Sequence, residues 1–179
     1  MMSELVKKIT PNFLVVTLMV FAAAFVRLIP HPPNFAPIAA IALFGGAYFN
    51  KKSLAFAVPL SAMFLTDAII GFHSGMWIVY LSFALIVVIG MLMLKKVNVK
   101  NVVLASVTAS ISFFFITNFG VWAFGTMYPK NIAGLIECYI AAIPFIQNTL
   151  IGDLFFSGIM FGVFEFAKTK IPVLSEAKA

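Results

Sequence analysis

The strongest constraint on this chain is its long runs of residues without a charge. The run from Ser82 to Leu94 is apolar on every face of any helix or strand that it could form. In hydrocarbon, each backbone N–H and C=O must be satisfied within the protein, which leaves α-helices or a closed β-barrel. Barrel strands alternate between apolar and polar residues, and this run does not alternate. The runs therefore predict transmembrane α-helices.

The composition supports a lipid environment for the whole chain. Hydrophobic residues make up 63% of the 179 residues and charged residues 10%, whereas soluble domains have about 25% charged residues. A water-soluble domain of this length has too little interior to hide so much apolar surface. We therefore expect the lipid bilayer to surround most of a single domain that takes up residues 1–179.

Six apolar segments predict the fold class, an all-α polytopic membrane protein with six transmembrane helices in one compact bundle. They cover roughly 12–29, 35–49, 54–72, 76–94, 101–125 and 145–167. Between the last two segments, Ile132 to Ala142 is expected to form a short helix at the outer surface, which Pro144 ends.

The second segment is shorter than the roughly 20 residues that a straight span needs, and prolines crowd its start. Short segments interrupted by proline or glycine often mark the binding site of a transporter. A short helix shielded by its neighbours, or one in a thinned bilayer, explains the same pattern. Both interpretations stay open at this point.

The basic residues predict the orientation of the six helices. Ten fall on one side of a six-pass arrangement, and only Arg27 and Lys130 fall on the other. The ten are Lys7, Lys8, Lys51, Lys52, Lys95, Lys96, Lys100, Lys168, Lys170 and Lys178. Basic residues concentrate on the cytoplasmic side of membrane proteins, so both termini are expected in the cytoplasm. A cleaved signal peptide ending near Ala24 would spoil this arrangement.

Polar side chains gather in the half of the bundle away from the lysines. Ionisable groups in a span usually pair with each other or face a cavity. Arg27 is therefore expected to pair with Asp67 or Asp153, and a surplus acid with neighbouring amides indicates an outward polar pocket. Asp67, Asn118 and Asp153 are expected to form its floor, with walls from the short second segment, from Asn34 onward, and from Trp122. The full set of candidate substrate-binding residues is Arg27, His31, Asn34, Asp67, His73, Asn118, Trp122, Asn148 and Asp153.

Several activities lack their sequence motifs. The chain has no phosphate-binding Gly-x-x-x-x-Gly-Lys loop, no His-Glu-x-x-His and no Gly-x-Ser-x-Gly. Cys138 is the only cysteine, and no spacing of ligands predicts a metal site. We expect no enzyme activity, no cofactor and no bound metal. The net charge of +6 reflects lysines at the membrane surface, so no nucleic-acid partner is expected.

One long stretch carries a resemblance to a known family. Residues 27–49, RLIPHPPNFAPIAAIALFGGAYF, together with TNFGVW at 117–122, Pro144-Phe145 and Gly152-Asp153, resemble an uncharacterised bacterial membrane family described as transport proteins. That match covers most of the chain. More distantly, the size and the six passes are similar to the S components of energy-coupling-factor (ECF) transporters. Those subunits bind vitamins and related micronutrients near the outer face.

The resemblance implies a location and partners. It implies a multi-pass protein of the bacterial inner membrane with both termini in the cytoplasm, which binds a small-molecule solute. A membrane scaffold subunit and ATPases would supply energy. One departure concerns the scaffold, because S components often carry Ala-x-x-x-Ala in the first helix, whereas Ala22, Ala23 and Ala24 are adjacent here.

We therefore expect the substrate-binding membrane subunit of a transporter that takes up a vitamin-like micronutrient. The alternative is a non-transporting structural subunit of a larger membrane complex. Small residues recur four apart in several segments, as at Gly158 and Gly162. Such pairs let helices approach closely, either within the bundle or against a partner subunit.

Overall fold

The computed structural model describes residues 10–175, and these form an all-α bundle. The helices are α2 (Pro11–Phe25), α3 (Ile38–Tyr48), α4 (Lys52–Ile70), α5 (Met76–Met93), α6 (Val99–Phe124) and α7 (Ile132–Lys170), with short 3₁₀ turns η1 (Val26–Leu28) and η2 (Pro172–Leu174). The predicted all-α bundle of six helices is confirmed. Five of the helices are long and apolar enough to cross a membrane, so this is a multi-pass membrane protein.

Three of the described helices, α2, α6 and α7, begin at a residue whose side chain accepts a hydrogen bond from an N–H of the first turn. Thr10 accepts a hydrogen bond from the N–H of Phe13 at the start of α2. Asn98 and Asn131 cap α6 and α7 in the same way. Such a side-chain acceptor replaces the partner that the first turn of a helix lacks. At its C-terminus, α4 is followed by Gly71, whose φ of 111° suits a residue without a Cβ.

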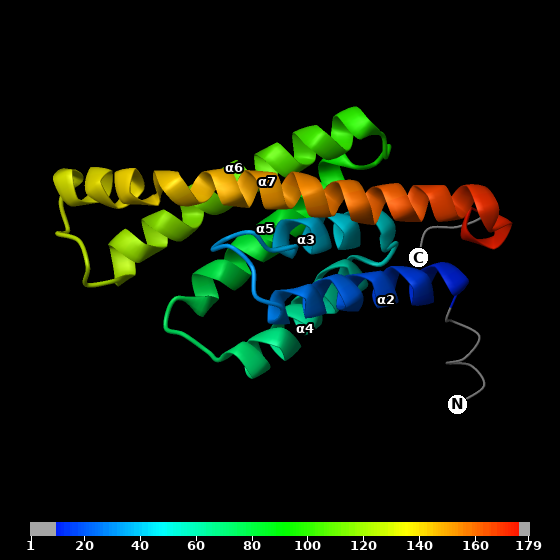
Figure 1. Cartoon of the computed structure of the whole chain (residues 1–179), viewed down its shortest axis with the longest axis horizontal. Coiled ribbons are helices and arrows are strands. Elements are labelled where there is room, and N and C mark those ends of the chain that lie inside the picture. The colour runs from blue at the N-terminus through cyan, green and yellow to red at the C-terminus, as the bar shows by residue number, and fades with distance from the viewer. Residues whose placement is uncertain (1–9, 176–179) are drawn as a thin grey trace.

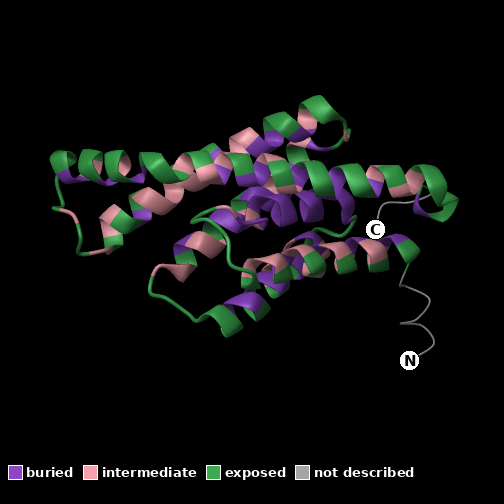
Figure 2. Cartoon of the chain, viewed as in Figure 1, coloured by how far each residue is buried: buried purple, intermediate pink, exposed green. Residues whose placement is uncertain are grey.

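The short helix α3 lies at the centre of the bundle. Its ten residues from Ala39 to Tyr48 are all buried, and Figure 2 shows it as a continuous buried ribbon between α7, α5 and α2. Its 11 residues extend only about 16 Å, half the thickness of the hydrocarbon core. The neighbouring helices shield α3 from lipid, and this accounts for a helix that is apolar all round.

Glycines allow α3 to approach its neighbours closely. A Cβ on Gly90 of α5 would lie 2.6 Å from the carbonyl oxygen of Leu43, and one on Gly46 would lie 2.3 Å from that of Val87. On the other side of α3, a Cβ on Gly45 would lie 2.5 Å from Cγ of Pro59. These residues bring α3 against α5 and α4 at backbone distance, which larger side chains would prevent.

The expected surface helix over 132–142 is wrong, because α7 runs without a break from Ile132 to Lys170. Proline removes one backbone N–H and its ring crowds the preceding turn, but membrane helices tolerate this where neighbours support the chain. Pro144 is exposed, so its ring does not disturb the packing. On the inner face, Tyr139 OH donates to the carbonyl of Phe115 at 2.8 Å. The first part of α7 thus packs along α6, and both extend past the other helices (Figure 1).

The bundle has two chemically different ends. Helix α2 begins and α7 ends at the same end of the bundle (Figure 1). The connections and the adjoining helix turns at that end carry the described lysines Lys51, Lys52, Lys95, Lys96, Lys100, Lys168 and Lys170. We call it the lysine-rich end. Arg27 and Lys130 lie at the opposite end, and Lys7, Lys8 and Lys178 lie outside the described residues.

Candidate functional site

Arg27 is the centre of a polar network at the end opposite the lysines. Its Nη2 lies 2.7 Å from Oδ1 of Asp67, and its Nη1 donates to Oγ1 of Thr66 at 2.6 Å. The second carboxylate oxygen of Asp67 accepts from Tyr80 OH at 2.8 Å. The partner of Arg27 is therefore Asp67 rather than Asp153. The network ties η1, α4 and α5 together and satisfies both oxygens of Asp67.

Asp153 serves a different helix junction. Its side chain on α7 is buried, and Oδ2 accepts a hydrogen bond from Ser110 Oγ of α6 at 2.6 Å. Ala39, in the first turn of α3, lies close to this carboxylate. That helix has no side-chain cap from its own N-cap residue, Pro37. Asp153 thus lies near the N-terminus of α3, where the positive end of the helix dipole favours a carboxylate.

A small cavity lies beside Asp153. It measures about 60 Å³ and is also lined by Asn34, Thr149 and Phe113. The loop before α3, which contains Asn34, is attached to α7, because Asn148 Nδ2 donates to the carbonyl of Pro33 at 3.0 Å. Sites for small organic molecules measure roughly 300–1,000 Å³, so this cavity is too small for such a ligand.

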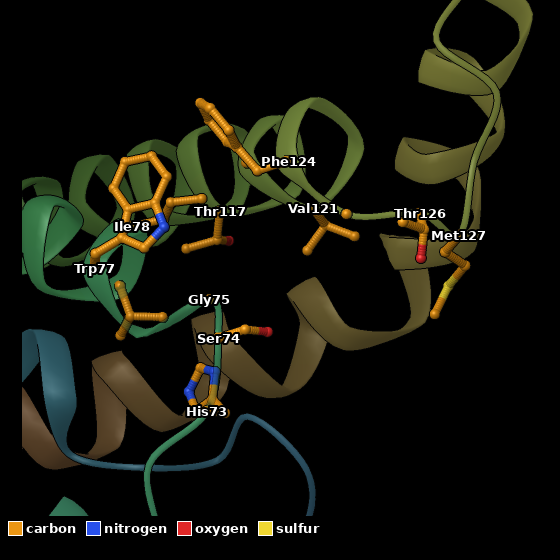
Figure 3. A pocket seen from close by; sticks show the side chains of 13 residues that line it. His73, Ser74, Gly75, Trp77, Ile78, Thr117, Val121, Phe124, Thr126 and Met127 are labelled. Atoms are coloured by element: carbon orange, nitrogen blue, oxygen red, sulfur yellow. The ribbon is translucent and has the colours of Figure 1, made fainter.

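A larger cavity of about 500 Å³ lies between the start of α5 and the end of α6. It is at the same end of the bundle as Arg27, and Figure 3 shows side chains from both helices and both adjoining loops around it. Its polar groups come from His73, Ser74, Thr117 and Thr126. Its apolar wall consists mainly of Trp77, Ile78, Val79, Val121, Phe124 and Met127.

The wall of this larger cavity is held by close packing at its base. The methyl groups of Ile78 fill the space above Gly120, where a Cβ would lie 2.1 Å from Ile78 Cδ1. The rings of Trp77 and Phe124 meet edge to face with centroids 4.8 Å apart, a favourable aromatic geometry. Helices α5 and α6 are therefore in contact beside the cavity, which lies between them and the loops.

The remaining predicted site residues satisfy their polar groups elsewhere or face outward. Asn118 Nδ2 donates to the carbonyl of Phe114 in its own helix at 2.8 Å. Trp122 Nε1 donates to the carbonyl of Pro129 at 2.9 Å, and Lys130 Nζ donates to the carbonyl of Trp122. These bonds order the α6–α7 loop. His31 is exposed in the connection before α3.

The structure brings some predicted site residues together and separates others. Arg27 forms an ion pair with Asp67, Asn34 and Asp153 line the same small cavity, and His73 lines the larger cavity. The expected floor of one pocket is not formed. Its three residues, Asp67, Asn118 and Asp153, each bind different partners in separate parts of the bundle.

Sequence reasoning missed most of the larger cavity, including Thr117 and Val121. The available signal was the pair of short polar stretches at the two helix ends, His73-Ser74 and Thr126 after Gly125.

The described residues contain no group of three His, Cys, Asp or Glu side chains that could hold a metal ion.

Comparison with known proteins identifies a family but no characterised relative. The model of a family of unknown function, DUF6580, matches residues 7–174. No curated protein and no solved structure matches the chain.

Proposed function

This chain belongs to the DUF6580 family, and we propose that it is the substrate-binding membrane subunit of a transporter that takes up a vitamin-like micronutrient. The observation that carries the proposal is the cavity of about 500 Å³ between α5 and α6. Its volume lies within the range of sites for small organic molecules, and its lining combines apolar walls with a few polar groups, as such sites do.

The chemistry of the lining suggests the kind of solute. The lining residues include one imidazole and three hydroxyl side chains, and they include no carboxylate and no lysine or arginine. Aromatic rings of Trp77 and Phe124 form part of the wall. We therefore propose a solute with a flat apolar part and a few neutral hydrogen-bonding groups. A strongly charged solute would lose its hydration without gaining an ionic partner.

The orientation supports uptake. With the lysine-rich end in the cytoplasm, the cavity opens toward the outside of a bacterial inner membrane, where a nutrient first meets the protein. The sequence has no nucleotide-binding loop, so energy would come from separate subunits, as in the ECF transporters that the chain resembles. Under this proposal a scaffold subunit and ATPases complete the transporter.

The first prediction tests the cavity directly. Val121→Phe fills part of the space and His73→Ala removes its imidazole, so both are expected to weaken solute binding at least about tenfold. The matched control is Phe119→Leu, because Phe119 is exposed on the same helix and does not line the cavity. Binding would be measured calorimetrically with purified protein and a panel of vitamins, nucleobases and corrinoids.

A structural role in a larger membrane complex is the competing function. It is favoured by one observation: Arg27, Asp67 and Asp153 all bind partners within the bundle. If no solute of the panel binds the wild type and a stable protein complex co-purifies from native membranes, this role replaces transport. If a solute binds but both cavity variants bind it as the wild type does, the site lies elsewhere.

A further inference from the structure

A third cavity lies at the lysine-rich end of the bundle, away from the proposed solute site. It is an apolar groove of about 350 Å³ between the first half of α6 and the second half of α7. Val102 and Val103 of α6 and Leu154 of α7 form its sides. Gly158 and Gly162 line it as well, and a Cβ on either would meet nothing within 4 Å. Unlike the glycines around α3, these two leave space that the bundle does not fill.

The groove contains one polar group without a partner. Ser106 lines it and is completely buried, and its Oγ has no hydrogen-bond partner among residues 10–175. A hydroxyl in apolar surroundings is costly unless it is hydrogen-bonded. A ligand with an acceptor, such as an ester carbonyl, would remove this cost.

One end of the groove is electropositive. Val97, Asn98 and Val99 line it there, so it reaches the N-terminus of α6. The first N–H groups of a helix attract anions such as phosphate. Lys96 and Lys100 flank this turn, and neither has an ion-pair partner among the described residues. Asn101 Nδ2 donates to the carbonyl of Lys96 at 2.8 Å, which fixes the turn against α6.

One carboxylate lies near the same end. Glu165 lines the groove, but its charge is compensated, because Lys168 Nζ lies 2.9 Å from Oε1. The same oxygen accepts from Tyr48 OH at 2.6 Å. The unpaired charge beside the groove is therefore positive.

We propose that this groove binds an anionic phospholipid. One acyl chain lies between α6 and α7 over Gly158 and Gly162, and the phosphate lies at the N-terminus of α6 near Lys96 and Lys100. An apolar helix of a partner protein would pack over the two glycines, but it would bring no anion to Lys96 and Lys100. Basic pockets between transmembrane helices are known to select anionic headgroups.

The test compares phosphatidylglycerol with phosphatidylcholine on the purified full-length chain. Bound lipid would be counted by native mass spectrometry and titrated by thermal shift. Phosphatidylglycerol is expected to bind the wild type, and the double variant Lys96→Gln, Lys100→Gln to bind it about 30-fold more weakly. The matched control is Lys51→Gln, Lys52→Gln, which removes the same charge at the same end.

A second pair of variants tests the apolar part. Gly162→Leu fills the groove and should reduce the number of tightly bound lipids by one, since the bundle has room for the new side chain. Val163→Leu is its control, because Val163 is exposed on the same helix and does not line the groove.

Three outcomes would overturn the proposal. They are equal binding of the two lipids, an equal loss with the Lys51 and Lys52 control, and retention of the lipid by Gly162→Leu. If a protein or a second copy of the chain instead co-purifies with the wild type, and only Gly162→Leu releases it, a helix occupies the groove.

Discussion

At the scale of single residues, buried polar side chains connect helices that are distant in the sequence. Arg27 and Asp67 are 40 residues apart and lie 2.7 Å from each other. Ser110 and Asp153 are 43 residues apart, and Ser110 Oγ donates to Asp153 Oδ2 at 2.6 Å. Inside a membrane protein such bonds replace hydration that lipid cannot supply, so each of them holds a particular pair of helices together.

The second prediction concerns the Arg27–Asp67 pair. Arg27→Ala leaves the carboxylate of Asp67 without its cation, and removing one partner of a buried pair costs about 3–5 kcal/mol of unfolding free energy. Lys168→Ala breaks the more exposed pair with Glu165 and should cost less than about 1 kcal/mol. Denaturant unfolding in detergent would measure both. Equal losses would show that the Arg27 pair does not lock the bundle.

At the scale of helices, α3 depends on glycines that admit its neighbours. The third prediction compares two Gly→Ala substitutions. In Gly90→Ala the new Cβ meets the backbone of Leu43 at 2.6 Å, so α3 and α5 must separate, at a cost of about 1–3 kcal/mol. In Gly158→Ala the Cβ meets nothing within 4 Å, and the higher helix propensity of alanine applies alone.

Thermal unfolding followed by tryptophan fluorescence checks this third prediction. Gly90→Ala should lower the midpoint, and Gly158→Ala should leave it unchanged or raise it. A lower midpoint for Gly158→Ala alone would mean that the tight packing lies along α7 and not around α3.

At the scale of the whole molecule, the separation of basic residues between the two ends predicts the orientation in the membrane. The fourth prediction uses single cysteines in a Cys138→Ser background, which is suitable because Cys138 is buried. An impermeant thiol reagent added to intact cells should label Ser74→Cys and Lys130→Cys, and should not label Lys52→Cys or Lys96→Cys. All four positions are exposed in the bundle. Labelling at position 96 in sealed cells would show that the orientation is the opposite one or that the predicted arrangement is wrong.

The fold could be predicted from the sequence because uncharged apolar runs leave a chain in lipid few alternatives to helices. The partner of Arg27 could not, since counting residues along a helix gives the depth of Asp67 and Asp153 but not which helix lies beside Arg27. The effect of Pro144 could not be predicted for a related reason. The energetic cost of a proline inside a helix depends on the neighbouring helix that supports it, which here is α6. Val121 of the larger cavity carried no signal, because an apolar residue in a span looks the same whether it faces lipid or a cavity.

The uninterrupted course of α7 has a mechanical consequence. Thirty-nine helical residues extend about 58 Å, almost twice the hydrocarbon thickness of a bilayer. Near its middle α7 holds the loop that contributes Asn34 to the small cavity, through Asn148, and toward its C-terminal end it forms one side of the groove with Gly158 and Gly162. One helix therefore contacts both places. A tilt of this helix about its middle moves its two ends, at opposite membrane surfaces, in opposite directions.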